Sequence, residues 1–310
     1  MKHIYPTAYH SFRCIADQCR HSCCVGWELP VDQKSSRRYQ KLKGELGTRI
    51  RHSLSNTADA FCPTEEGRCP HLREDGLCAL IVEAGEEILP TVCQRHPRYE
   101  NAYGLTAREH GLGLSCEEVC RLLLGTSLSF VDQKGREVRE DSFVGTPGDR
   151  FLSVKYHIMD LILAEGTPLE ERIRYLGEEL GARVDCDLAK IALPSLHTLE
   201  RLDDDFWNKI SEISDFSPLC DNFSLQYSRF LALTFYRFAR LDANLPAVFS
   251  FSVLLLRLLD ALLSMAPRMT EESLFDLARA LSTEIEYSED NTDALIAYLE
   301  GQNFLFSRGK

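Results

Sequence analysis

Residues 249–266, FSFSVLLLRLLDALLSMA, form the most apolar stretch of this 310-residue chain and decide its fold class. Arg257 and Asp260 lie near the middle of the stretch, where either charge would be costly inside a lipid bilayer. We therefore predict a buried core helix, and treat a membrane span as the weaker alternative. No membrane partner is expected.

The rest of the second half also has helical periodicity. In residues 149–166 the apolar positions Phe151, Val154, Ile158, Leu161 and Ile162 fall on one face. The next helix is predicted over 167–181, with a capping box of Thr167 and Glu170 and an end at Gly181. Further helices are predicted over 32–43, 115–124, 226–242, 248–265, 271–286 and 292–300, and a short ribbon over 128–138.

Composition and charge limit the classes of function that this chain could have. The chain is 44% hydrophobic and 26% charged, which is typical of a globular protein with a sizeable core. Its net charge of −12 argues against nucleic acid as a partner, because phosphate binding needs a basic face. Residues 121–310 carry 20 Lys and Arg against 31 Asp and Glu. This excess could attract a lysine-rich partner, although an ordinary solvated acidic surface is the preferred explanation.

Cysteine usage separates the two halves of the chain. Ten of the twelve cysteines lie in residues 1–120, and four of them fall in CIADQCRHSCC, residues 14–24. The opening MKHIYPTAYHSF lacks the apolar run of a secretory signal, so we expect a cytoplasmic protein. In that reducing compartment, clustered cysteines bind metal more often than they form disulfides. We predict a mainly α fold, with an irregular cysteine-rich metal-binding half (1–125) followed by an α-helical domain (126–310).

The cysteine spacing leaves the type of metal open. Zinc ligands usually come in pairs separated by two to four residues, and this chain fits that rule only loosely. Iron–sulfur clusters tolerate less regular spacing. The adjacent Cys23 and Cys24 cannot easily aim both sulfurs at one ion, so different roles are expected for them. Cys186 and Cys220 are predicted to be small core residues, while Cys62, Cys120 and His96 stay ambiguous.

Four ordered blocks resemble a known family. They are YPTAYHSFRCIADQCRHSCCVGWELPVD, GRCPHLREDGLCAL, TVCQRHPRY and LSCEEVCRLLL. Together these blocks resemble the flagellin lysine N-methylases and the wider group of zinc- or iron-chelating cysteine-rich proteins. The family pattern falls on eight cysteines, which the resemblance implies as metal ligands: Cys14, Cys19, Cys23, Cys24, Cys69, Cys78, Cys93 and Cys116.

The resemblance implies a protein lysine N-methyltransferase. Its methyl donor would be S-adenosylmethionine, its protein substrate flagellin, and its cofactor an iron–sulfur cluster of the 4Fe-4S type, with zinc as the alternative. No glycine-rich methyltransferase pattern is visible in the residues themselves. Two other functions remain open: a non-enzymatic zinc- or iron-binding module with a helical interaction domain, and a thiol redox sensor.

Methyl transfer requires an acceptor lysine that has lost its proton. Carboxylates and tyrosines near the cysteine blocks could accept that proton, but we assign none of them as catalytic. Trp27 follows the cysteine cluster closely and could shield it from water. The candidate proton acceptors are Asp32, Tyr99, Tyr103, Glu117 and Glu118.

Overall fold

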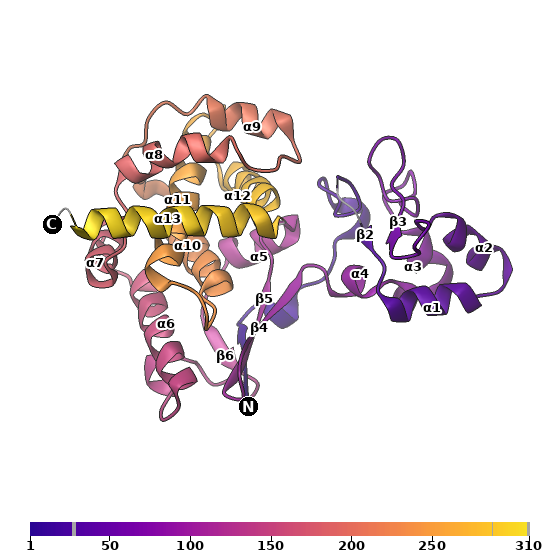
Figure 1. Cartoon of the computed structure of the whole chain (residues 1–310), viewed down its shortest axis with the longest axis horizontal. Helices are drawn as coiled ribbons and strands as arrows, with labels where there is room; N and C mark the ends of the chain where they lie inside the picture. The colour runs from indigo at the N-terminus through magenta and orange to yellow at the C-terminus, as the bar shows by residue number, and fades with distance from the viewer. Residues whose placement is uncertain (27–28, 287, 309–310) are drawn as a thin grey trace. The chain divides into compact units, whose positions relative to one another are not determined.

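The computed structural model describes residues 1–26, 29–286 and 288–308, and it divides the chain into two compact units (Figure 1). The larger unit consists of Met1–Phe12, Glu100–Ser115 and Val119–Lys310. The smaller unit consists of Arg13–Tyr99 and Cys116–Glu118. The boundary predicted at residue 125 does not coincide with this division, because strands from the first half of the sequence belong to the larger unit.

Helices make up most of the larger unit, and the prediction of a mainly α protein is confirmed for the described residues. The helix α11 lies at the centre and contacts α7, α8, α9, α10, α12 and α13 (Figure 1). The helices are α5 (Glu117–Gly125), α6 (Pro147–Leu163), α7 (Leu169–Leu180), α8 (Cys186–Leu196), α9 (Asp204–Ser211), α10 (Ser224–Phe238), α11 (Leu245–Ser264), α12 (Glu271–Glu286) and α13 (Glu289–Arg308), with 3-10 turns at Tyr9–Ser11, Glu140–Ser142 and Asp221–Phe223.

The helix α11 is a core helix, as predicted. It is long and apolar enough to cross a membrane, but 89% of its most apolar window is buried within the protein. Its two interior charges have partners on neighbouring segments. Arg257 pairs with Glu170 of α7 at 2.6 Å, and Asp260 accepts a hydrogen bond from Tyr227 of α10 at 2.7 Å. These partners explain how two charged residues fit a buried helix.

Helix termini agree with the sequence in part. The Gly181 cap of α7 has the expected left-handed conformation. The capping box predicted at Thr167 and Glu170 is wrong, because Pro168 occupies the N-cap position of α7 without a side-chain cap and Glu170 pairs with Arg257 instead. A capping box does form one helix earlier, where Thr146 and Asp149 close the first turn of α6.

A four-stranded sheet in the larger unit was not foreseen. Its order is β4-β5-β1-β6, with β1 parallel to β5 and antiparallel to β6. The ribbon predicted over 128–138 corresponds to β6 and the segment after it, in which Glu137 forms an antiparallel β-bridge with Val131. The strands are β1 (Lys2–Pro6), β4 (Arg98–Tyr103), β5 (Ala107–Leu112) and β6 (Phe130–Asp132).

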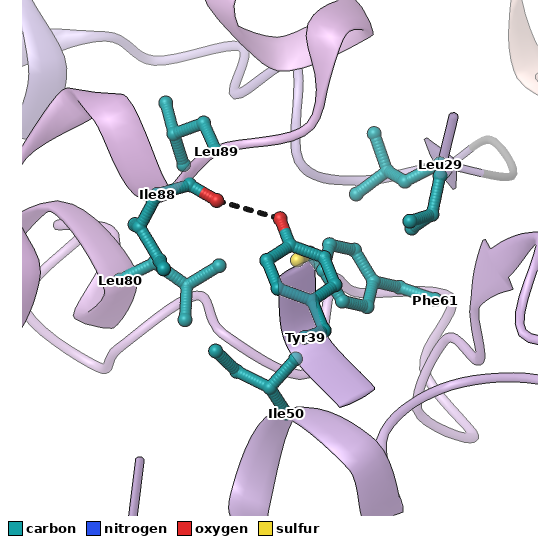
Figure 2. Close-up of a cluster of buried hydrophobic side chains, with 9 residues drawn as sticks. Leu29, Tyr39, Ile50, Phe61, Leu80, Ile88 and Leu89 are labelled. Atoms are coloured by element: carbon teal, nitrogen blue, oxygen red, sulfur yellow. Dashed lines mark hydrogen bonds between the residues drawn. The ribbon is translucent and has the colours of Figure 1, made fainter. Parts of the chain in front are cut away.

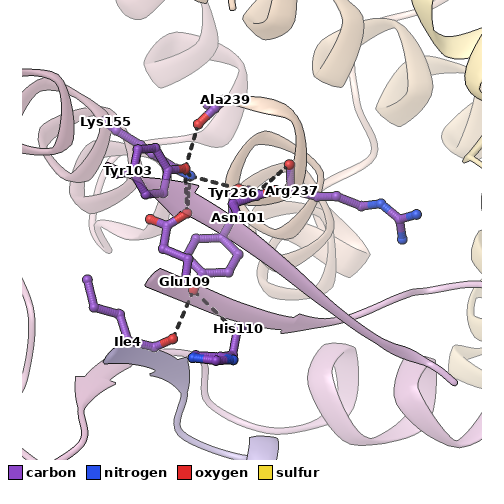
Figure 3. A network of polar contacts seen from close by, with 9 residues as sticks. All are labelled: Ile4, Asn101, Tyr103, Glu109, His110, Lys155, Tyr236, Arg237 and Ala239. Carbon is purple, nitrogen blue, oxygen red and sulfur yellow. Dashed lines mark hydrogen bonds and ion pairs between the residues drawn. The ribbon is translucent and has the colours of Figure 1, made fainter. Parts of the chain in front are cut away.

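A buried ion pair joins this sheet to two helices (Figure 3). Lys155 of α6 lies 2.5 Å from Glu109 of β5, and both side chains are fully buried. Lys155 also donates to the Tyr103 hydroxyl at 2.7 Å and to the Tyr236 carbonyl of α10 at 2.8 Å. Burial raises the pKa of Glu109 and lowers that of Lys155, while their mutual attraction opposes both shifts. The pair therefore depends on these contacts to stay charged.

Short elements and a compact apolar cluster form the smaller unit. The cluster surrounds Tyr39, whose hydroxyl donates to the Ile88 carbonyl at 2.7 Å (Figure 2). Asp32 caps α1 by accepting a hydrogen bond from the Ser35 N–H at 3.0 Å. The start predicted for this helix at residue 32 is therefore confirmed. The elements are β2 (Leu29–Pro30), α1 (Gln33–Lys41), α2 (Gly44–His52), β3 (Ala60–Phe61), α3 (Ala79–Ala84) and α4 (Thr91–Arg95), with 3-10 turns at Ala16–Gln18 and Glu86–Ile88.

Candidate metal centre

The smaller unit contains all eight cysteines predicted as ligands. Seven of them lie within Arg13–Tyr99. The eighth, Cys116, belongs to the same unit although its neighbours Ser115 and Val119 belong to the larger one. The unit therefore gathers thiols that are up to about a hundred residues apart in the sequence, and they fall into two groups.

Four of these thiols pack against the apolar cluster of the smaller unit, and we call them the inner cysteines: Cys24, Cys69, Cys78 and Cys93. The Cys69 N–H donates to the Cys24 carbonyl at 2.7 Å, which holds two of the segments side by side. Burial, together with the smaller effect of the other three inner thiols, raises the pKa of the Cys93 thiol to about 12. That mutual effect places all four within electrostatic range of one another.

Backbone amides surround two of the inner thiols. Burial raises the pKa of Cys69 to about 12, while the N–H groups of His71 and Leu72 act in the opposite direction. Burial likewise raises the pKa of Cys78, and N–H groups in the first turn of α3 oppose that rise. Amides directed at a sulfur favour the thiolate, which is the form that binds metal. Both turns therefore suit a metal-bound sulfur.

The other four thiols do not belong to the apolar cluster, and Cys14 is exposed while the other three are half-buried; we call these four the outer cysteines: Cys14, Cys19, Cys23 and Cys116. Arg20 and Glu117 connect their segments. The carboxylate of Glu117 accepts from the Arg20 N–H at 3.0 Å and from its Nε at 3.1 Å. The Cys19 sulfur lies 3.8 Å from the same carboxylate. This contact brings Cys19 close to Cys116, the residue before Glu117.

Electrostatic interactions complete the outer group. Cys14 and Cys116 both act on the Cys23 thiol, and Cys14 acts on Cys19. The strongest influence on Cys23 is a hydrogen bond with Cys24, which raises the pKa of Cys23 and lowers that of Cys24 to about 7. One hydrogen bond thus links the two adjacent thiols, although each also interacts electrostatically with a different group of thiols.

The thiols are neighbours, but they are not arranged as a coordination shell. Within residues 1–26, 29–286 and 288–308, no group of three or more His, Cys, Asp or Glu side chains is placed to hold a metal ion. Instead, Cys19 donates its S–H to the His21 carbonyl at 3.3 Å. Metal binding would have to displace such protons and turn the sulfurs toward one point.

The remaining cysteines belong to neither group. Cys120 is fully buried and donates to the Leu114 carbonyl at 2.8 Å, as expected of a core residue. Cys62 is exposed. Cys186 and Cys220 lie in the larger unit and are half-buried, so their predicted burial in the core is only partly correct.

The other candidates differ in their surroundings. His96 caps the C-terminal end of α4, the helix that carries Cys93. Asp32 accepts from Ser35 and from the Thr91 N–H at 2.8 Å, and Tyr103 belongs to the buried network of the larger unit. Glu118 is 8% exposed and Tyr99 is half-buried. Trp27 lies outside the described residues.

Glu117 is a proton-acceptor candidate in contact with a thiol of the outer group, since its carboxylate lies 3.8 Å from the Cys19 sulfur. Partial burial acts to raise the pKa of Glu117, but hydrogen bonds from Arg20 hold it below its usual range. An ionised carboxylate suits attraction of a lysine ammonium better than removal of its proton. Sequence reasoning missed Arg20, although its position directly after Cys19 was a signal that could have been used.

Comparisons with known proteins support the resemblance seen in the cysteine blocks. The chain is 28% identical over 127 residues to the lysine-N-methylases of Salmonella typhimurium and Salmonella choleraesuis, a match that covers 38% of this chain and 31% of each relative. It is equally similar to the flagellar biosynthetic protein FliU of Salmonella muenchen, of which the match covers 75%. No family model and no solved structure matches the chain. The predicted similarity to the flagellin lysine N-methylase family is therefore confirmed for about two fifths of the chain.

Proposed function

We propose that this protein is a lysine N-methyltransferase that acts on flagellin and uses S-adenosylmethionine as the methyl donor. The observation that carries the proposal is the gathering of the eight family cysteines in one unit, Cys116 included. The names of the relatives, lysine-N-methylase and flagellar biosynthetic protein, support the reaction and the substrate. Because the match covers only 31% of the lysine-N-methylases, the activity is a proposal for this chain.

The chemistry of the thiols, rather than their present arrangement, suits an iron–sulfur cluster. They are soft ligands, they come in groups of four, and amides that favour thiolates surround two of them. A cluster with an open iron would bind the methionine part of the donor and polarise its sulfonium. The reaction itself needs the lysine amine to attack the methyl carbon while the carbon–sulfur bond breaks. The departing S-adenosylhomocysteine keeps the electron pair, and the proton leaves the new methylammonium to solvent.

Negative charge on the protein supports a lysine-bearing substrate. Glu117 is held ionised by Arg20 next to Cys19, where its carboxylate would attract a lysine side chain. Over a longer range, the excess of acidic residues in 121–310 would favour approach of a basic surface. Both effects act before the chemical step, and neither assigns a catalytic base.

A methylation assay tests the proposal. Protein purified without oxygen and loaded with iron and sulfide is incubated with flagellin and labelled S-adenosylmethionine. We expect label on flagellin lysines with the wild type and with Cys62→Ser, the exposed cysteine outside both groups. Cys23→Ser should lose most of the metal and the activity, because metal affinity depends on the thiolate ligands. Full metal content in Cys23→Ser would contradict the ligand assignment, and unlabelled flagellin with metal-loaded wild type would contradict the function.

A further inference from the structure

Two histidines on neighbouring strands of the larger unit are in direct contact. Nδ1 of His3, on β1, lies 2.9 Å from Nε2 of His110, on β5. At that distance one of the two nitrogens must donate a hydrogen bond and the other must accept it. The two facing nitrogens therefore hold one proton between them. In this arrangement the pair of rings can carry no more than one positive charge.

Aromatic and acidic side chains pack around the pair. The Tyr5 ring stacks on His110 with the ring centres 4.5 Å apart. Tyr9 and His10, in the turn after β1, both contact the Tyr5 ring. Glu100 of β4 lies 3.6 Å from Nδ1 of His110, the ring nitrogen that does not face the other histidine. The pair is therefore enclosed by groups from three strands and a turn, all within the larger unit.

The charges around the pair act in opposite directions. Burial lowers the pKa of His110, and the carboxylate of Glu100 opposes that shift. His3, Arg108 and His10 act in the same direction as burial. Arg108 also forms an ion pair with Glu100, which leaves this carboxylate less able to balance the imidazoles. These surroundings are compatible with one charge on the two rings, whereas a second charge would add repulsion without a new counter-charge.

We infer that His3 and His110 form a proton-sensitive latch that joins β1 to β5. While the two rings carry at most one charge, the hydrogen bond between their nitrogens holds the strands together. A second charge places a proton on both facing nitrogens, which cannot then stay 2.9 Å apart. The latch is thus closed at neutral pH and opens as the pH falls. This inference goes beyond the proposed methyl transfer and does not depend on it.

Opening of the latch would affect the middle of the sheet, because β1 lies between β5 and β6. Successive side chains of a strand point to opposite faces, so the latch lies on the face away from the buried Glu109–Lys155 pair. Ile4 is paired with Glu109 across the two strands, and the Tyr236 hydroxyl lies within hydrogen-bond distance of the carbonyls of both Ile4 and His110 (Figure 3). Acid should therefore loosen the sheet that covers this ion pair before the larger unit unfolds as a whole.

Hydrogen exchange of the full-length protein between pH 7 and pH 5 tests the latch, in a window above the range in which Asp132 titrates. Exchange of the β1 and β5 amides is followed by mass spectrometry and corrected for the intrinsic effect of pH. Protection of these strands should fall about tenfold per pH unit once opening takes up one proton. His3→Gln keeps a side chain that can hydrogen-bond but cannot titrate, so its protection should not change with pH. His197→Gln, at an exposed histidine of the same unit, is the matched control and should behave like the wild type.

Protection of the wild-type strands that does not depend on pH would overturn the inference. So would the same pH dependence in His3→Gln as in the wild type. An NMR titration of the wild type with isotope-labelled histidine gives a second readout that needs no stable variant. His3 and His110 should respond to each other in two coupled steps, while His197 titrates in a single step. Independent single-step titrations of His3 and His110 would also overturn the latch.

Discussion

At the scale of single residues, Lys155 and Glu109 show why some buried positions escape sequence reasoning. The predicted apolar face of α6 included Val154, which is 46% exposed, while Lys155 is fully buried. Burial of a lysine is normally too costly, but Glu109, Tyr103 and the Tyr236 carbonyl all lie within hydrogen-bond distance of its ammonium. Those partners are far away in sequence, so no local pattern could have revealed them.

Replacing Lys155 with methionine should destabilise the larger unit by about 3–5 kcal/mol, because Glu109 would stay buried without its counter-charge. Urea unfolding followed by circular dichroism measures the loss. The double variant Lys155→Met/Glu109→Gln should recover part of it, since the uncompensated charge is gone. Lys134→Met, at an exposed lysine, is the control and should unfold like the wild type. Equal stability of Lys155→Met and Lys134→Met would show that the ion pair contributes nothing.

At the scale of secondary structure, most of the long helices were predictable, whereas the shorter helices α2, α3, α4, α8 and α9 and the sheet were not. The helix α11 is apolar on all sides and was correctly expected in the core. In β5 the inward positions are Ala107, Glu109 and Gly111. Burial therefore alternates along this strand, but hydrophobicity does not, because one of the buried residues is a glutamate. The grouping of the cysteines was only partly predictable: the family resemblance implied eight of them as candidate ligands, and the adjacency of Cys23 and Cys24 indicated separate roles. Which thiols lie together depends on the packing around Tyr39.

The β6 hairpin should respond to acid through Asp132. Its carboxylate accepts from Arg136 at 2.6 and 2.8 Å and from two backbone N–H groups. The Arg136 hydrogen bonds lower the pKa of Asp132 to about 2, below its value in the unfolded chain. The stabilisation is therefore complete above pH about 4 and is lost as the pH falls toward 2. Thermal melts of the wild type and Asp132→Asn should differ at pH 6 and converge near pH 2; a constant difference would contradict this linkage.

At the scale of the whole molecule, the smaller unit is an insertion in the larger one. The chain leaves the larger unit after Phe12, returns at Glu100, and leaves it again for Cys116–Glu118. A cut in the linear sequence therefore cannot separate the units cleanly. A fragment of residues 1–125 keeps β1, β4 and β5 but lacks α6 and α10, whose Lys155 and Tyr236 contact that sheet.

The fragment 1–125 should bind metal, but copies of it should associate with one another through the sheet that α6 and α10 no longer cover. It should not methylate flagellin. The shorter fragment 13–118 keeps all eight cysteines and omits β1, so it should bind the same amount of metal with less association. Size-exclusion chromatography with metal analysis of the eluted fractions compares the two. A monomeric 1–125 fragment that methylates flagellin as well as the full chain would contradict this expectation.

The insertion also has a consequence for the order in which the protein assembles. The strand β1 must pair with β5, where Lys2 lies opposite Ala107, and the whole of Arg13–Tyr99 separates the two strands. Bringing such distant ends together costs more loop entropy when the intervening chain is unfolded than when it is already compact. If metal folds the smaller unit first, it also shortens the search by which β1 finds its partner. Refolding followed by the fluorescence of the buried Trp207, in a Trp27→Phe background, should therefore be faster with Zn²⁺ than with a chelator. Equal refolding rates with Zn²⁺ and with the chelator would mean that the sheet forms independently of metal binding. A faster rate with Zn²⁺ would mean that the supply of metal limits how quickly the helical part of the molecule folds.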